Sequence, residues 1–220
     1  MKIRSIVTLF AACALLLGAC RSNPHYNPTK SHHTEDGFRN NYPHPPRASF
    51  WKWQWERWTQ GVPDNPPGGY GFPLLKPDAG FLAANSDEPT LTWIGHASFL
   101  LQIGGVNVLT DPHLTERASP VSFAGPKRQV PPALDFDTLP HVDIVVISHS
   151  HYDHLDLQTV KQLSRQQGGA PLFLVPLGLK AWFKAQDIDN VTQLDWWEKA
   201  NYRGLRLTLA PVQHWSARTP

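Results

Sequence analysis

Cysteine is scarce in this sequence. Among 220 residues there are only two, Cys13 and Cys20, and both lie close to the N-terminus. The rest of the chain can therefore form no disulfide and no thiolate metal site, so any metal ion bound there has to be held by histidine and carboxylate side chains. Hydrophobic residues make up 41% of the sequence, which is enough for a packed core and excludes wholesale disorder.

An excess of either charge is also missing. The sequence has 20 Lys and Arg against 18 Asp and Glu. Lys2 and Arg4 lie in a segment that is expected to be removed, which leaves 18 residues of each sign in the mature chain. This balance gives no support for a nucleic-acid partner, because proteins that bind nucleic acid usually carry a basic surface.

The apolar stretch near the N-terminus is too short to cross a bilayer. Residues 6–17 are uncharged and mostly apolar, but twelve residues cannot span about 30 Å of hydrocarbon as a helix. Together with the basic start, this length is typical of a secretory signal. The segment ends in Leu-Gly-Ala-Cys at residues 17–20, which resembles the cleavage signal of bacterial lipoproteins.

The resemblance implies that residues 1–19 are a lipoprotein signal peptide and that Cys20 becomes the lipidated first residue of the mature chain. Arg21 stands where an Asp would favour retention in the inner membrane. In a Gram-negative host, the resemblance therefore implies a lipid anchor in the outer membrane of the cell envelope, facing the periplasm. A plain signal peptide or a buried helix with an incidental cysteine is the alternative.

Proline and glycine are frequent in the segment that follows. Residues 24–89 contain eleven prolines and six glycines, so long helices and central strands are not expected, and residues 20–89 are predicted to be an arm or tether. Four tryptophans lie within residues 50–58, and their spacing fits both a strand and a helix. We expect them to pack against the domain, with a membrane interface or a substrate groove as the alternatives.

From residue 90 onward the sequence consists of short apolar runs between turns, which is typical of strands. The expected strands are residues 91–94, 99–103, 106–109, 144–147, 172–175 and 205–209. The first three are separated by short turns and predict an antiparallel meander. Asp156 can cap a helix that runs to Gly168, and residues 179–185 predict a second, shorter helix. Together these elements predict a layered α/β or α+β domain.

The residues that carry chemistry follow the apolar strand at 144–147. His149 and His151 alternate, so in an extended backbone both point to the same side and can bind one ion. Asp153 and His154 come as the chain turns toward the next helix and can serve a second ion a few ångströms away. Imidazole and carboxylate suit Zn²⁺, with Fe or Mn as alternatives. The pattern disfavours the other interpretation, a solvated histidine-rich loop.

This His-x-His-x-Asp-His pattern after an apolar strand resembles the signature of the metallo-β-lactamase superfamily. Three further segments are similar to the branch that contains N-acyl-phosphatidylethanolamine-hydrolysing phospholipase D and its bacterial lipoprotein relatives. These segments are residues 92–99, 109–112 and 213–218. The resemblance extends over roughly residues 40–220, so it rests on several separated segments rather than on one motif.

For the site, the resemblance implies two zinc ions in a complete domain. The first is held by three histidines, matched here by His149, His151 and His214. The second is held by an Asp-His pair, matched by Asp153 and His154. Asp153 is also the candidate catalytic residue. Taken alone, His214 is weak evidence, because a single histidine beside a tryptophan is more often structural.

Two further residues are candidates for a supporting role. His96 and Asp111 each lie at the end of an expected strand, where they could orient a ligand without binding the ion themselves. The remaining histidines are expected to be surface residues; they include His25, His32, His33, His44, His113 and His141.

The superfamily fold pairs two similar α/β halves in an αββα sandwich, and it takes a bridging Asp and a last His from the second half. Neither ligand follows His214 before residue 220. Residues 90–220 are therefore expected to be the N-terminal half of such a domain, either as a piece of a longer protein or as a half that pairs with another chain.

The resemblance implies a metal-dependent hydrolase in which a metal-bound hydroxide attacks phosphorus or a carbonyl carbon. Cleavage of a phosphodiester in a phospholipid is the leading activity. Hydrolysis of a lactone or another ester is the enzymatic alternative, and a membrane-anchored binding module without catalysis is the alternative outside enzymes. The expected partners are a small-molecule or phospholipid substrate and the membrane, and the oligomeric state stays open.

Overall fold

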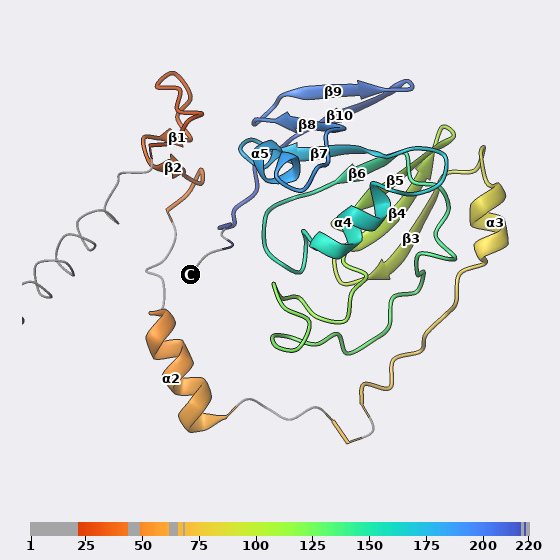
Figure 1. Ribbon diagram of the computed structural model, residues 1–220, viewed down its shortest axis with the longest axis horizontal. Coiled ribbons are helices and arrows are strands. Elements are labelled where there is room, and N and C mark those ends of the chain that lie inside the picture. The colour runs from red at the N-terminus through yellow and green to blue at the C-terminus, as the bar shows by residue number, and fades with distance from the viewer. Residues whose placement is uncertain (1–21, 44–48, 62–65, 68, 217, 219–220) are drawn as a thin grey trace, which may run out of the picture. The chain divides into compact units, whose positions relative to one another are not determined.

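The computed structural model describes residues 22–43, 49–61, 66–67, 69–216 and 218 (Figure 1). The expected signal peptide and its lipidation site, Cys20, lie outside these residues. The chain divides into two compact units, residues 1–43 and residues 44–220. Within the described residues, no helix has the length and apolar character needed to cross a membrane.

The first unit contains a short hairpin. Its strands are β1, His33–Thr34, and β2, Gly37–Phe38, which pair antiparallel. The side-chain amide of Asn23 donates hydrogen bonds to the carbonyl oxygens of Thr34 and Gly37 at 3.1 and 2.8 Å. Two strands this short are not stable alone in water, so these bonds contribute to holding the hairpin closed.

A six-stranded mixed sheet organises the second unit. Its strands, in spatial order, are β3 (Thr90–Gly95), β4 (Ser98–Ile103), β5 (Val106–Thr110), β6 (Ile144–Val146), β7 (Leu172–Pro176) and β8 (Val191–Leu194). The first three strands pair antiparallel, which confirms the predicted meander. The strands from β5 to β8 pair parallel. The domain is therefore a mixed α/β domain, as predicted.

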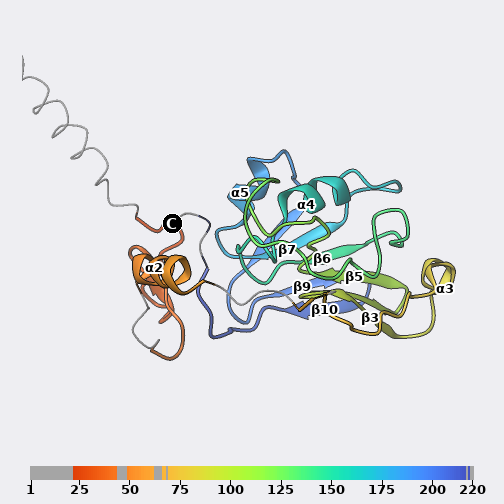
Figure 2. The same ribbon diagram turned by 90° about the horizontal axis from the view of Figure 1, so that it is seen from below.

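Helices cover one face of this sheet and a hairpin covers the other (Figure 2). The helices are α4 (Leu157–Leu163) and α5 (Lys180–Lys184), and the hairpin strands are β9 (Lys199–Tyr202) and β10 (Leu205–Thr208). Val160 and Phe183 of the helices pack in one core with Phe173 of the sheet. Leu207 of the hairpin packs in a second core with Ile144. Because the central strands face both cores, residues 144–147 are apolar at every position.

The Asp156 side chain caps helix α4, as predicted, by accepting a hydrogen bond from the Gln158 N–H at 3.2 Å. The helix ends at Leu163 and is shorter than predicted. Gln166, which follows it, pairs its side-chain amide with both backbone groups of Val142, at 3.1 and 2.7 Å. These bonds tie the following turn to the chain before β6 instead of extending the helix. Helix α5 lies within the predicted range.

The tryptophan-rich segment lies in helix α2, Phe50–Gln60, so the structure decides between helix and strand. The expected packing of its tryptophans against the domain is wrong, since Trp51, Trp55 and Trp58 are 79%, 60% and 77% exposed. Trp51, Trp55 and Trp58 lie on one face of the helix, and this face stays exposed instead of being buried in a core. A second short helix, α3, spans Ala79–Ala84.

Candidate metal centre

Side chains that can bind a metal gather at one edge of the sheet. Because β4 pairs antiparallel with both β3 and β5, these two strands run in the same direction, and β6 is parallel to β5. The C-terminal ends of all three therefore lie at one edge, which is where ligands collect in open α/β sheets. His96 follows β3, Asp111 follows β5, and residues 148–154 follow β6.

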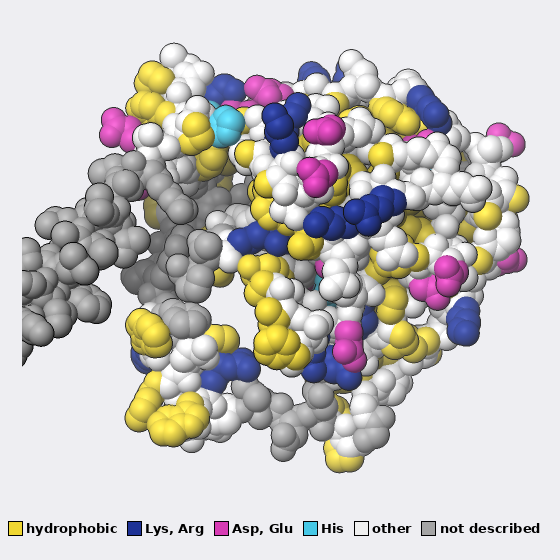
Figure 3. Space-filling model, viewed as in Figure 1, with side chains coloured by type: hydrophobic (Ala, Val, Ile, Leu, Met, Phe, Trp, Pro, Cys, Tyr) yellow, Lys and Arg dark blue, Asp and Glu magenta, His cyan; other side chains and the backbone are white. Residues whose placement is uncertain are grey.

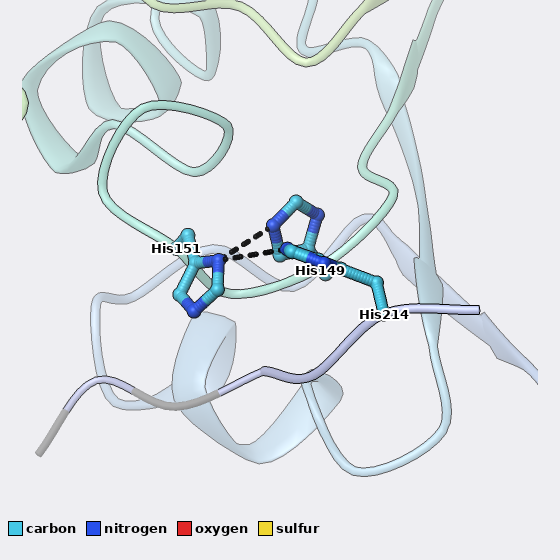
Figure 4. Close-up of side chains that lie close together, drawn as sticks. All are labelled: His149, His151 and His214. Atoms are coloured by element: carbon cyan, nitrogen blue, oxygen red, sulfur yellow. Dashed lines mark hydrogen bonds between the residues drawn. The ribbon is translucent and has the colours of Figure 1, made fainter. Parts of the chain in front are cut away.

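Three histidines form the first group (Figure 4). Nε2 of His149 lies 2.8 Å from Nδ1 of His151, and Nε2 of His214 lies 3.3 Å from the same atom. One nitrogen from each residue lies within 4.8 Å of the others, a spacing that can hold one metal ion. His214 is 63 residues away from His151 in sequence, so tertiary folding completes the group. The structure thus brings together the three residues that the sequence assigns to the first ion.

Asp153 and His154 form a second group together with His96. Nε2 of His96 lies 2.8 Å from Oδ2 of Asp153, and Nε2 of His154 lies 3.4 Å from the same oxygen. The three ligand atoms lie within 4.8 Å of one another. His96 therefore contacts a candidate ligand directly. The ring centroids of His149 and His154 are 4.1 Å apart, so the two groups adjoin.

Asp111 connects the sheet to residues 148–154, which we call the histidine loop. Its carboxylate accepts hydrogen bonds from the N–H and the hydroxyl of Ser148 at 2.6 and 2.7 Å. Its Oδ2 also lies 3.0 Å from Nδ1 of His154, which leaves Nε2 of that ring to face Asp153. Asp111 thus contacts His154 from outside residues 148–154, and its orienting role stays a prediction.

The backbone at this edge is strained. His96 and Asp111 have φ angles of 52° and 37°, in the left-handed region that residues other than glycine seldom adopt. Such strain costs about 1–3 kcal/mol per residue and persists where the surrounding structure holds it, often at functional sites. His96 and Asp111 thus both have a strained backbone, and each contacts the Asp153–His154 pair from outside the histidine loop.

Burial and hydrogen bonding determine which of these groups carry a proton. Burial, aided by the neighbouring imidazoles, lowers the pKa of His149 to about 4, so this ring is neutral at pH 7. Burial also lowers the pKa of His151. Hydrogen bonds to Asp111 and Asp153 raise the pKa of His154 to about 9. The hydrogen bond with His154 holds the pKa of Asp153 well below its usual range. Without an ion, His154 therefore carries a proton at neutral pH, which an ion has to displace.

The arrangement of the first group fits a cation better than a set of hydrogen bonds. Nδ1 of His151 faces two other imidazole nitrogens, yet an imidazole nitrogen has either one proton or one lone pair. At most one of the two contacts can therefore be an ordinary two-centre hydrogen bond, whereas one metal ion accepts a lone pair from each ring. Nε2 of His151 is also buried and has no hydrogen-bond partner among the described residues. Neutral imidazoles beside a carboxylate suit Zn²⁺, Fe or Mn.

The segment that carries His214 is held against the histidine loop by residues that the sequence analysis did not single out. The Arg218 guanidinium donates a hydrogen bond to the Ser150 carbonyl oxygen at 2.7 Å and lies 4.5 Å from the centre of the Tyr152 ring. The Tyr152 hydroxyl donates back to the Arg218 carbonyl oxygen at 2.9 Å. The Ser150 N–H donates to the Ser216 hydroxyl at 3.1 Å. The signal in the sequence was the resemblance of residues 213–218 as a whole.

We therefore expect Arg218→Ala to weaken metal binding at the three-histidine group. The substitution removes the guanidinium that links the His214 segment to the loop, while His149 and His151 keep their positions. Loss of such a supporting contact typically lowers metal affinity about 10–100-fold. Zinc titration against a competing chelator measures the change, and Arg206→Ala, an exposed arginine on β10, is the matched control. Identical zinc affinities in the two variants would contradict this role of Arg218.

Three histidines expected on the surface are buried, namely His32, His33 and His113. The best-defined case is His113, whose N–H donates to the Ser98 hydroxyl at 3.1 Å and whose carbonyl oxygen accepts from Arg128. Burial lowers the pKa of His113, so the ring is neutral inside the domain. A lone histidine in the sequence does not reveal this, because its burial depends on distant partners.

Comparison with known proteins gives a consistent family assignment. Residues 106–220 match the family described as Beta-lactamase superfamily domain. An uncharacterized protein of Mycobacterium tuberculosis is 41% identical over 149 residues, which cover 67% of this chain and 39% of that protein. N-acyl-phosphatidylethanolamine-hydrolyzing phospholipase D 1 of Caenorhabditis elegans is 44% identical over 132 residues, or 56% of this chain and 37% of that protein.

A more distant relative carries a general description. A UPF0173 metal-dependent hydrolase of Methanopyrus kandleri is 29% identical over 124 residues, which cover 56% of this chain and 46% of that protein. The chain thus spans less than half the length of each of these curated relatives.

Proposed function

This chain belongs to the metallo-β-lactamase superfamily, and we propose that the protein is a metal-dependent hydrolase that cleaves a phosphodiester bond in a phospholipid. The observation that carries the proposal is the pair of adjoining groups at one sheet edge, one of three histidines and one that joins His96, Asp153 and His154. Adjoining sets of imidazole and carboxylate donors are the ligand chemistry of two-metal hydrolytic sites.

The residues of the two groups have separate roles in this proposal. The imidazole rings of His149, His151 and His214 would hold one ion, and Asp153 with His154 would hold the other. Ions bound there supply Lewis acidity and lower the pKa of a water molecule toward neutrality. The Asp153 carboxylate, ionised at neutral pH because its pKa is depressed, can accept a hydrogen bond from the attacking water and orient it.

Two observations support a lipid phosphodiester as the substrate. The relative from Caenorhabditis elegans is named for hydrolysis of N-acyl-phosphatidylethanolamine and is 44% identical over 56% of this chain. The Leu-Gly-Ala-Cys sequence at residues 17–20 supports lipidation of Cys20. We propose that this anchor holds the protein on a bacterial membrane, on the periplasmic side of the outer membrane. Phospholipid would be available there as the substrate.

The test is hydrolysis of N-acyl-phosphatidylethanolamine by the metal-loaded protein. We expect release of the N-acylated headgroup, and we expect Asp153→Asn to reduce the rate to background. Asp137→Asn changes an exposed carboxylate that belongs to neither group of candidate ligands and is the matched control.

A lactone and a carboxylic ester serve as comparison substrates in the same assay. Turnover of either of these without turnover of the phospholipid would replace the proposed activity by lactone or ester hydrolysis. Bound metal without turnover of any substrate would favour a non-catalytic binding module.

A further inference from the structure

Helix α2 presents a compact patch of tryptophan. Trp51, Trp55 and Trp58 are spaced i, i+4 and i+7, so they lie on one face of the helix. Each is at least 60% exposed, and the ring centroids of Trp55 and Trp58 are 5.2 Å apart. Figure 3 shows hydrophobic side chains of α2 at the molecular surface. Three exposed indoles on one helical face are the kind of apolar patch that marks an interaction site.

The other sides of α2 carry its charged residues together with Trp53. Lys52 and Glu56 form an ion pair at 3.8 Å. The guanidinium of Arg57 lies over the ring of Trp53, 4.7 Å from its centre, so the fourth tryptophan is partly covered by a cation. The helix therefore has an aromatic face and a charged face, as do helices that lie in the plane of a membrane surface.

The chemistry of the aromatic face favours a lipid surface over a protein groove. It is built of tryptophan and contains no aliphatic side chain. Indole combines an apolar ring with an N–H donor, which makes tryptophan the residue that accumulates at headgroup depth. A purely apolar protein groove would leave those N–H groups without partners.

The position of α2 in the chain points to the same partner. The helix begins 30 residues after Cys20, the proposed lipidation site. An anchor there would keep the helix at a high local concentration next to the bilayer. The helix would therefore be inserted for much of the time even if its own affinity for the membrane were weak. We propose that α2 is a membrane-surface helix that places Trp51, Trp55 and Trp58 among phospholipid headgroups.

The experiment separates this insertion from the lipid anchor. The mature chain from residue 20 with Cys20→Ser carries no acyl group, so any membrane binding comes from the protein itself. Vesicles of phosphatidylethanolamine and phosphatidylglycerol in equal parts, with brominated acyl chains, quench the fluorescence of tryptophans that insert. We expect this chain to sediment with the vesicles and to be quenched. Simultaneous Trp51→Gln, Trp55→Gln and Trp58→Gln is expected to lower the partition coefficient at least about tenfold.

The matched control removes an exposed tryptophan outside α2. Trp197→Gln alters a side chain that is 65% exposed and should leave the partition coefficient unchanged. Equal zinc content and circular dichroism in all variants show that each folds. Equal partitioning of the α2 variant and the unsubstituted chain would overturn the proposal, and so would an absence of quenching. The latter is the expected outcome if the patch packs against protein or against a second copy. Neither outcome depends on hydrolytic activity.

Discussion

His149→Ala and His151→Ala are each expected to abolish metal binding at the three-histidine group. Removing one of three closely placed imidazoles leaves too few bonds to retain an ion against water and buffer. The loss in metal affinity should exceed the roughly 100-fold loss that follows when a residue that only supports a ligand is removed. Asp153→Ala should chiefly affect the second group. Zinc per chain, measured by elemental analysis after dialysis, checks both statements.

His141→Ala is the matched control for these variants. His141 is exposed and lies in the same domain, but it belongs to neither group of candidate ligands. Its substitution should leave zinc content unchanged. Equal zinc content in the unsubstituted protein, His149→Ala and His151→Ala would show that these residues do not hold the ion, and the proposed site would be wrong.

Phe173→Ala is expected to lower the free energy of unfolding by about 3–5 kcal/mol. Phe173 lies on β7, is fully buried, and its ring centroid is 5.1 Å from that of Phe183 on α5. The substitution opens a cavity between the sheet and the helices, where neighbouring side chains cannot fully close it. Because a typical domain is stable by about 5–15 kcal/mol, the loss is a large part of the total. Urea unfolding followed by circular dichroism measures it.

The control for this prediction is Phe123→Ala. Phe123 is 82% exposed, so its removal should change the free energy of unfolding by no more than about 0.5 kcal/mol. If both variants unfolded at the same urea concentration, the core between β7 and α5 would not be the source of stability inferred here.

Local sequence patterns predicted the strands and the helix that position the candidate metal ligands at one edge of the sheet. The meander of β3 to β5, the apolar strand β6 and the cap of α4 each leave a short-range signal, because alternation and capping depend on residues close in sequence. Strands β8 and β9 were not predicted. Their sequences, Val-Thr-Gln-Leu and Lys-Ala-Asn-Tyr, do not form apolar runs. They are strands because β8 pairs with β7 and β9 pairs with β10 in a hairpin.

The sequence by itself determined the metal chemistry of the histidine loop. Nitrogen and oxygen donors come together at the end of a buried strand because His149, His151, Asp153 and His154 follow it directly, however the rest of the chain folds. Only the tertiary structure decided which other groups join them. His96 reaches Asp153 across 57 positions, and Asp111 reaches His154 across 43. These contacts exist because β6 pairs parallel with β5, so that β3, β5 and β6 end at one edge, and the pairing of β5 with a strand so far along the chain is a non-local choice that no short-range pattern encodes.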